Sequence, residues 1–114
     1  MKIEDTYEKP FPDTELTEED FVPIESIVGR EIEIHETKTY ENDRGPGIYI
    51  LFRFATNKKD PEPYKYTATH SINLCSILTK DMVVEALNSG DCLECKLVKR
   101  PSKRDGSKTV YTLI

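Results

Sequence analysis

Short stretches of the chain alternate hydrophobic and polar residues, which is the pattern of strands with one face on a core and the other in water. Alternation, together with β-branched and aromatic content, predicts five strands, over residues 28–39, 48–56, 64–69, 92–100 and 109–114. In the second strand one parity is wholly apolar and should face the core: Ile48, Ile50, Phe52 and Phe54. The opposite face then carries Tyr49, Leu51 and Arg53.

The segments between the strands carry turn and helix signals. Turn-forming residues are dense at 41–47 and 57–63, and an Asp-Gly pair marks a hairpin loop at 101–108. Apolar residues at helical spacing predict a helix from about Lys80 to Asn88, which Gly90 ends; a separate turn before it is left open. The predicted order is therefore β-β-β-α-β-β.

This order predicts an all-β fold in which one helix separates the third and fourth strands. It is the order of the OB-fold, a five-stranded and partly open Greek-key barrel. We expect such an OB-fold-like domain over residues 23–114. An SH3-like or other small barrel, and an α+β sheet covered by one helix, are the competing architectures.

Charge is unevenly distributed along the sequence. The 114 residues carry a net charge of −5, which taken alone argues against a nucleic-acid partner. Residues 1–28, however, hold 2 basic and 9 acidic side chains, a net −7, and residues 29–114 hold 14 basic and 12 acidic ones, a net +2. We therefore predict a loosely ordered acidic arm over residues 1–22, in which large apolar side chains such as Phe11 and Phe21 could act as anchors.

Composition argues against several other classes of protein. No apolar run approaches the roughly 20 residues of a membrane span, and the first residues lack the apolar segment of a secretory signal. Three Cys are too few, and odd in number, for a disulfide scaffold. The expectation is a cytoplasmic protein with no membrane association and no cofactor.

An OB-fold binds nucleic acid across its second and third strands, between the loops that join strands 1–2 and 4–5. Stacking rings and phosphate-following cations suffice there for binding without sequence preference. The last predicted hairpin is rich in cations: Lys99, Arg100, Lys103, Arg104 and Lys108. We predict a nucleic-acid interface made of strand residues and hairpin residues, namely Tyr49, Arg53, Lys65, Tyr66, Arg100, Lys103 and Arg104.

Four short segments also carry a resemblance to a known family. Residues 28–32 read Val-Gly-Arg-Glu-Ile and 47–51 read Gly-Ile-Tyr-Ile-Leu, while 66–71 read Tyr-Thr-Ala-Thr-His-Ser and 110–114 read Val-Tyr-Thr-Leu-Ile. Over residues 26–114 the sequence resembles the small OB-fold single-stranded-DNA-binding proteins of phages and plasmids. The resemblance implies that the ligand is single-stranded DNA. His70 and the long loop at 57–63 depart from the family's pattern.

The cysteine and histidine residues predict neither a metal site nor an active site. Cys92 and Cys95 form a Cys-x-x-Cys, but strand positions three apart point to opposite faces, and a second pair is missing. His35, His70 and Cys75 show no catalytic spacing, and the sequence has no Gly-rich phosphate-binding motif. We therefore expect no metal ligands, no catalytic residues and no enzyme activity.

Two hypotheses for function follow. The first is binding of single-stranded DNA with little sequence preference. The alternative is an OB-like protein–protein interaction module that uses the acidic arm and the exposed aromatic face. A protein partner bound through the arm, and assembly into a homo-oligomer, are compatible with either.

Overall fold

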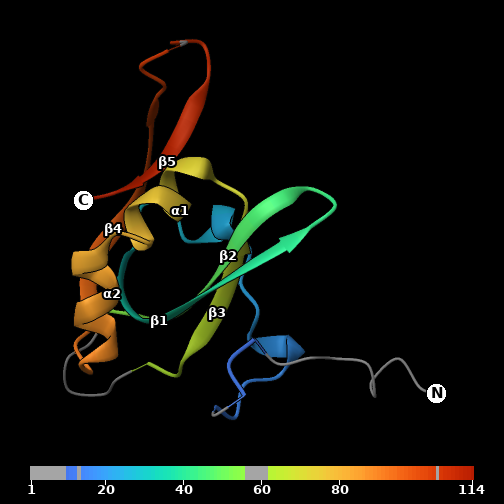
Figure 1. Ribbon diagram of the computed structural model, residues 1–114, viewed down its shortest axis with the longest axis vertical. Helices are drawn as coiled ribbons and strands as arrows, with labels where there is room; N and C mark the ends of the chain where they lie inside the picture. The colour runs from blue at the N-terminus through green and yellow to red at the C-terminus, as the bar shows by residue number, and fades with distance from the viewer. Residues whose placement is uncertain (1–9, 13, 56–61, 105) are drawn as a thin grey trace.

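The computed structural model describes residues 10–12, 14–55, 62–104 and 106–114, and its five strands form one antiparallel sheet (Figure 1). The strands are β1 (Glu31–Asn42), β2 (Gly45–Phe54), β3 (Lys65–Thr69), β4 (Leu93–Pro101) and β5 (Thr109–Leu113). Their order in the sheet is β3-β2-β1-β4-β5. The prediction of a mostly β fold with five strands is confirmed. Among the strands of the described ranges, β3 pairs only with β2 and β5 only with β4, so the sheet is open.

The connection from β3 to β4 contains two helices, so the prediction of a single helix is wrong. They are α1 (Ile72–Leu78) and α2 (Asp81–Asn88). α1 begins where the Ser71 side chain accepts a hydrogen bond from the Leu74 amide at 3.2 Å, and it buries Leu74 and Leu78, four residues apart on one face. Among the described residues, no helix is both long and apolar enough to cross a membrane.

The β1–β2 hairpin is tighter than predicted. The ladder between these strands continues to the pair Asn42 and Gly45, so most of the predicted loop at 41–47 is strand. The turn is stabilised by the Arg44 amide, which donates to Asn42 Oδ1 at 2.9 Å, and by Gly45, whose φ of +99° favours glycine. The predicted strand boundaries at 39 and 48 are therefore both several residues too far from the turn.

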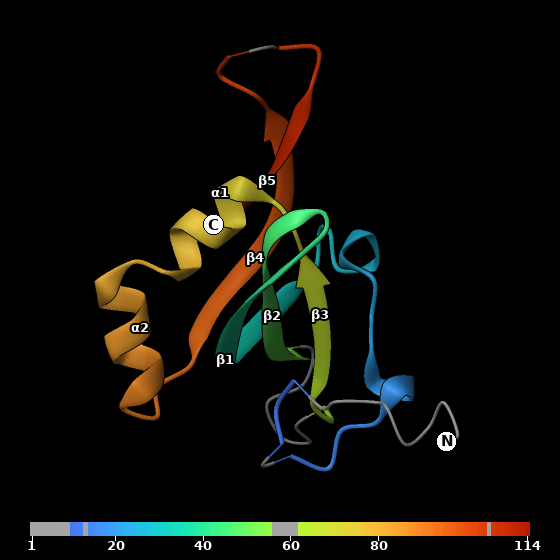
Figure 2. The same ribbon diagram turned by 45° about the vertical axis from the view of Figure 1, so that its right-hand side comes forward.

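The main core lies between the sheet and the helices, and the N-terminal segment lies on the other side of the sheet (Figure 2). The apolar parity predicted for β2 faces this core, because Ile48, Ile50 and Phe52 are buried there with Leu74 and Leu78. The full buried set is Ile27, Ile32, Ile34, Ile48, Ile50, Phe52, Leu74, Leu78 and Leu97.

Two short 3-10 turns precede β1, η2 (Glu18–Asp20) and η3 (Ile24–Ser26). The segment that contains η2 runs along the outer face of the sheet, where Phe11 and Leu16 are buried against Leu51 and Tyr66. Residues 1–9 and 13 of the predicted arm lie outside the described residues. The described part of the arm covers apolar side chains that β2 and β3 would otherwise expose.

A β-bulge in β1 changes which side chains face outward. Ile34 pairs with Phe52 and Glu36 pairs with Leu51, which leaves His35 without a partner on β2. A bulged residue of this kind bends its strand and changes the direction of the side chains near it.

Candidate nucleic-acid interface

The β4–β5 hairpin presents the predicted cations on a well-defined backbone. The strands pair from Leu97 with Leu113 to Pro101 with Thr109, and the Ser102 amide donates to the Lys108 carbonyl at 2.8 Å beyond the last pair. The Arg104 amide in turn donates to Ser102 Oγ at 3.2 Å. These two hydrogen bonds continue the hairpin beyond its last strand pair. In Figure 1 the β4–β5 hairpin extends past the body of the sheet.

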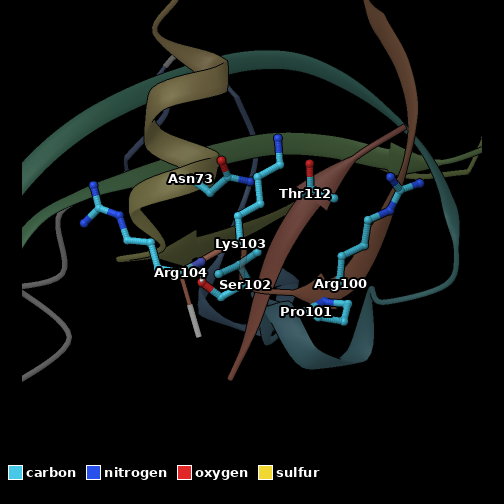
Figure 3. Close-up of a pocket in the computed structure, with 8 residues that line it drawn as sticks. Asn73, Arg100, Pro101, Ser102, Lys103, Arg104 and Thr112 are labelled. Carbon is cyan, nitrogen blue, oxygen red and sulfur yellow. Dashed lines mark hydrogen bonds between the residues drawn. The ribbon is translucent and has the colours of Figure 1, made fainter. Parts of the chain in front are cut away.

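A hollow of about 480 Å³ lies between this hairpin and the start of α1 (Figure 3). Among the residues that the structure describes, its lining contains three cations and no carboxylate: Asn73, Arg100, Pro101, Ser102, Lys103, Arg104, Val110 and Thr112. The Asn73 side chain joins the helix to the hairpin, because its amide donates to the Tyr111 carbonyl at 2.7 Å. In the view of Figure 3, Lys103 lies between Arg104 and Arg100.

The three cations of this hollow are exposed, whereas Lys99 is engaged within the protein. The ion pairs found among the described residues lie elsewhere, and none involves Arg100, Lys103 or Arg104. Lys99 Nζ lies 2.7 Å from Glu25 Oε1. Lys99 and the Tyr111 hydroxyl, which also bonds Glu25, lower the pKa of that carboxyl. Among the described residues, three predicted phosphate contacts therefore have no acidic partner.

The predicted stacking residue Tyr66 lies beneath the arm. Only 5% of it is exposed, and Phe11, Leu16 and Leu51 surround it. The Phe21 ring meets the Tyr66 ring edge-on with 5.5 Å between centroids, and the Val22 amide donates to the Tyr66 carbonyl at 2.9 Å. While the arm is docked, a nucleotide base has no access to this ring.

Arg53 and Lys65, the two predicted cations of this face, each have an acidic partner. Arg53 Nη2 lies 3.2 Å from Glu33 Oε1, and this hydrogen bond raises the pKa of the guanidinium while lowering the pKa of Glu33. Lys65 Nζ lies 3.4 Å from Asp20 Oδ1 of the arm. The backbone amide of Thr17 and then Lys65 lower the pKa of Asp20. Arg53 and Lys65 are therefore less available to phosphate than the hairpin cations.

Tyr49 belongs to an aromatic patch that we define as Tyr40, Tyr49 and His70, near the β1–β2 turn. The ring centroids of Tyr40 and Tyr49 lie 4.4 Å apart, and those of Tyr40 and His70 lie 5.3 Å apart. His70 Nδ1 lies 3.0 Å from the Pro46 carbonyl, which can only accept, so Nδ1 carries the proton and Nε2 accepts from the Tyr40 hydroxyl at 3.4 Å. All three rings are half-buried.

The predicted interface is therefore divided into parts. The β4–β5 hairpin brings Arg100, Lys103 and Arg104 together, whereas Tyr49 lies in the aromatic patch of the β1–β2 hairpin. On that hairpin the exposed Lys38 pairs with Tyr49 across the ladder, and the exposed Arg44 lies in the turn. Prediction from the sequence omitted Tyr40 and His70 from the site. The available signal was Gly47, because it lies opposite Tyr40 and a side chain there would contact its ring.

Comparisons of the chain with protein-family models, with curated proteins and with solved structures found no match. A functional proposal for this protein therefore rests on the residues described above, together with the resemblance noted in its sequence motifs.

Proposed function

We propose that this protein binds single-stranded DNA with little sequence preference, chiefly through the β4–β5 hairpin. The observation that carries the proposal is the hollow at this hairpin, whose described lining holds no carboxylate and where Arg100, Lys103 and Arg104 are exposed and have no ion-pair partner among the described residues. Unpaired cations gathered on one surface attract phosphate groups and release the counterions bound to them.

The proposal includes an OB-fold-like barrel. In support, β1 pairs with β2 on one side and with β4 on the other, and the chain passes from β3 to β4 through the helices. On an OB-fold, the β1–β2 and β4–β5 loops form the walls of the ligand groove.

The ligand would follow a path from the basic hairpin to the aromatic patch. Arg100, Lys103 and Arg104 would contact phosphates, and Tyr40 and Tyr49 would stack on bases. The path avoids Tyr66, which the arm covers. This assignment differs from the sequence-based one in giving the hairpin the main role and the β3 side chains a minor one.

A salt-dependent titration tests the proposal. A fluorescein-labelled oligo-dT of about 20 nucleotides exceeds the ~4–16-nucleotide site of one OB domain, and fluorescence anisotropy would follow its binding at about 50 and 200 mM salt. We expect binding that weakens steeply with salt and is competed by unlabelled single strands of any sequence. A lack of binding at the lower salt would refute the proposal, and equal competition by single-stranded RNA would broaden the ligand class.

A protein-interaction module is the second candidate, because the outer face of β2 and β3 already holds a peptide segment. Phe11 and Leu16 fill an apolar site there, and Asp20 pairs with Lys65 beside it. A partner with a similar acidic and aromatic segment would compete with the arm. A labelled peptide of residues 10–22, added to protein that lacks residues 1–22, would bind under this hypothesis, whereas oligo-dT would not.

A further inference from the structure

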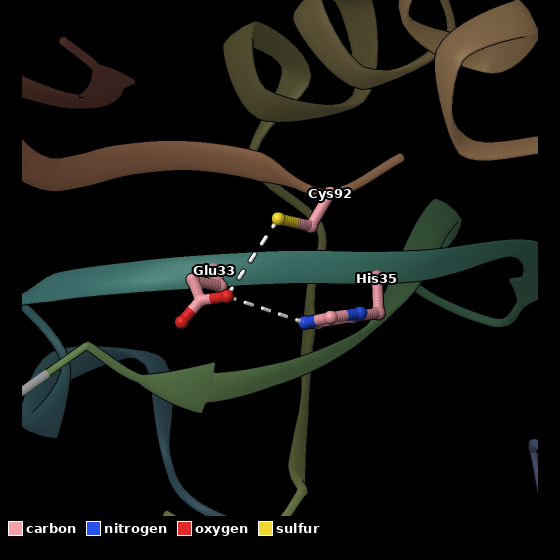
Figure 4. Close-up of side chains that lie close together, drawn as sticks. All are labelled: Glu33, His35 and Cys92. Atoms are coloured by element: carbon pink, nitrogen blue, oxygen red, sulfur yellow. Dashed lines mark hydrogen bonds and ion pairs between the residues drawn. The ribbon is translucent and has the colours of Figure 1, made fainter. Parts of the chain in front are cut away.

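A cluster of three potential metal ligands lies on the outer face of the sheet, away from the basic hairpin (Figure 4). Glu33 and His35 extend from β1, and Cys92 lies just before β4, beside the paired residues Ile34 and Leu93. Their ligand atoms all lie within 4.8 Å of one another. The motif Cys92–Cys95 does not create this cluster, since Cys95 packs against the main core.

The spacing of the three ligand atoms fits a small tetrahedral ion. Cys92 Sγ lies 3.6 Å from Glu33 Oε1, and His35 Nε2 lies 3.7 Å from the same oxygen. Bonds of about 2.3 Å from zinc to sulfur and about 2.0–2.1 Å from zinc to nitrogen or oxygen place the ligand atoms of a tetrahedral site about 3.3–3.6 Å apart. Small side-chain adjustments would bring all three atoms to one ion.

His35 supplies an independent observation. Its Nε2 is buried and has no hydrogen-bond partner in the described structure, although it points toward the Glu33 carboxylate and the Cys92 thiol (Figure 4). A buried nitrogen without a partner is uncommon in proteins and calls for a reason. The bulge removes His35 from the β1–β2 register, and the Tyr64 ring meets the imidazole edge-on at 5.0 Å. The ring is thus held with Nε2, which has no hydrogen-bond partner in the described structure, directed into the cluster.

We propose that Glu33, His35 and Cys92 form a binding site for Zn²⁺. A thiol and an imidazole select a transition metal over Mg²⁺ or Ca²⁺, which take oxygen ligands. On binding, the Cys92 thiol releases its proton to solvent and the thiolate binds the ion, so that Glu33 and Cys92 together balance the two positive charges. Arg53, which bonds Glu33, is the outer partner that orients the carboxylate. The remaining position would hold water, because His35 and Glu33 keep 22% and 19% side-chain exposure.

Titration with CoCl₂ tests the site directly, because Co²⁺ takes the place of Zn²⁺ and absorbs visible light. We expect the strong d–d bands of tetrahedral Co²⁺ and a thiolate-to-cobalt charge-transfer band, both removed when ZnCl₂ is added. Cys92→Ala should abolish the charge-transfer band, and Cys95→Ala, the matched loss of a nearby thiol, should keep it. His35→Ala should weaken Zn²⁺ binding at least about tenfold, since even outer-shell changes cost about 10–100-fold.

A second measurement uses the unaltered protein, so the test does not depend on the folding of a variant. ZnCl₂ should slow alkylation of Cys92 by iodoacetamide at least about tenfold, in line with a thiolate held as a ligand, and should leave Cys75 unchanged, as mass spectrometry of the labelled peptides would report. Only weak octahedral Co²⁺ absorption, a charge-transfer band that survives Cys92→Ala, or equal alkylation with and without ZnCl₂ would each overturn the site. Each outcome is independent of oligonucleotide binding.

Discussion

Removal of two hairpin cations provides the sharpest test of the proposed interface. In Lys103→Gln/Arg104→Gln, both side chains keep most of their length and polarity but lose their charge. Both cations are exposed and lack an ion-pair partner among the described residues, so the substitutions break none of the ion pairs found there. The free energy of unfolding should change by less than about 0.5 kcal/mol, as is usual for surface substitutions.

The expected effect on binding follows from counterion release. Each phosphate contact on a single strand contributes about 0.7 to the slope of log K against log salt, so loss of two contacts lowers the slope by about 1.4. Between about 50 and 200 mM salt, the wild type should then lose about sevenfold more affinity than the variant. Adding Arg100→Gln should bring the change in slope to about 2.

A charge-matched variant separates a local effect from a change in net charge. Lys80→Gln/Lys96→Gln removes two cations whose side chains do not line the hollow, and its salt slope should equal that of the wild type. Anisotropy titrations of labelled oligo-dT at four salt concentrations would measure all the slopes. Equal slopes for the two double variants would refute the hairpin as the phosphate-binding surface, even if both bind more weakly than the wild type.

Three further predictions concern the rest of the structure. Gly47→Ala would place a methyl group 2.4 Å from the Tyr40 ring, so we expect a loss of about 1–3 kcal/mol in urea denaturation; unchanged stability would contradict this packing. Phe11→Ala should weaken docking of the arm by up to about 3–5 kcal/mol, which limited proteolysis would detect as faster cleavage within residues 10–22. If the docked arm competes with DNA, the same variant should bind oligo-dT more tightly. Slower or unchanged proteolysis would contradict docking of the arm. Burial and then Glu25 raise the pKa of Tyr111 to about 12, so the contribution of this hydroxyl to folding stability is complete below pH 10 and is lost as pH rises through 12. Tyr111→Phe should remove a step near pH 12 from the ultraviolet titration, and a titration unchanged by that substitution would exclude the assignment.

Strand positions were predictable because one parity of β2 is wholly apolar. That pattern placed Ile48, Ile50 and Phe52 on the core face, where the structure has them. The turn between β1 and β2 was less predictable, since its length depends on how far the ladder extends rather than on the number of turn-forming residues. Glu41, Pro46 and Gly47 belong to strands because pairing continues to Asn42 and Gly45.

The outer face could not be predicted from alternation alone. The parity of Leu51 and Tyr66 indicates an outward face, but only tertiary structure shows that Phe11 and Leu16 cover it. The β-bulge likewise depends on pairing with β2, and it determines that His35 has no partner there. The Glu33–His35–Cys92 cluster joins residues 59 positions apart, a separation that no local motif in the sequence identifies.

The uneven charge of the chain has a specific structural consequence. Two acidic residues of the negative N-terminal part form ion pairs with cations of the positive body, Asp20 with Lys65 and Glu25 with Lys99. A third body cation, Arg53, pairs with Glu33. The Asp20–Lys65 and Arg53–Glu33 pairs lie on the outer face of the sheet and the Glu25–Lys99 pair involves β4 of the hairpin, so they neutralise these cations of the body while leaving Arg100, Lys103 and Arg104 unpaired among the described residues. A net charge of −5 is therefore compatible with one strongly positive surface, since the potential that guides a polyanion depends on where the unpaired cations gather rather than on the total charge.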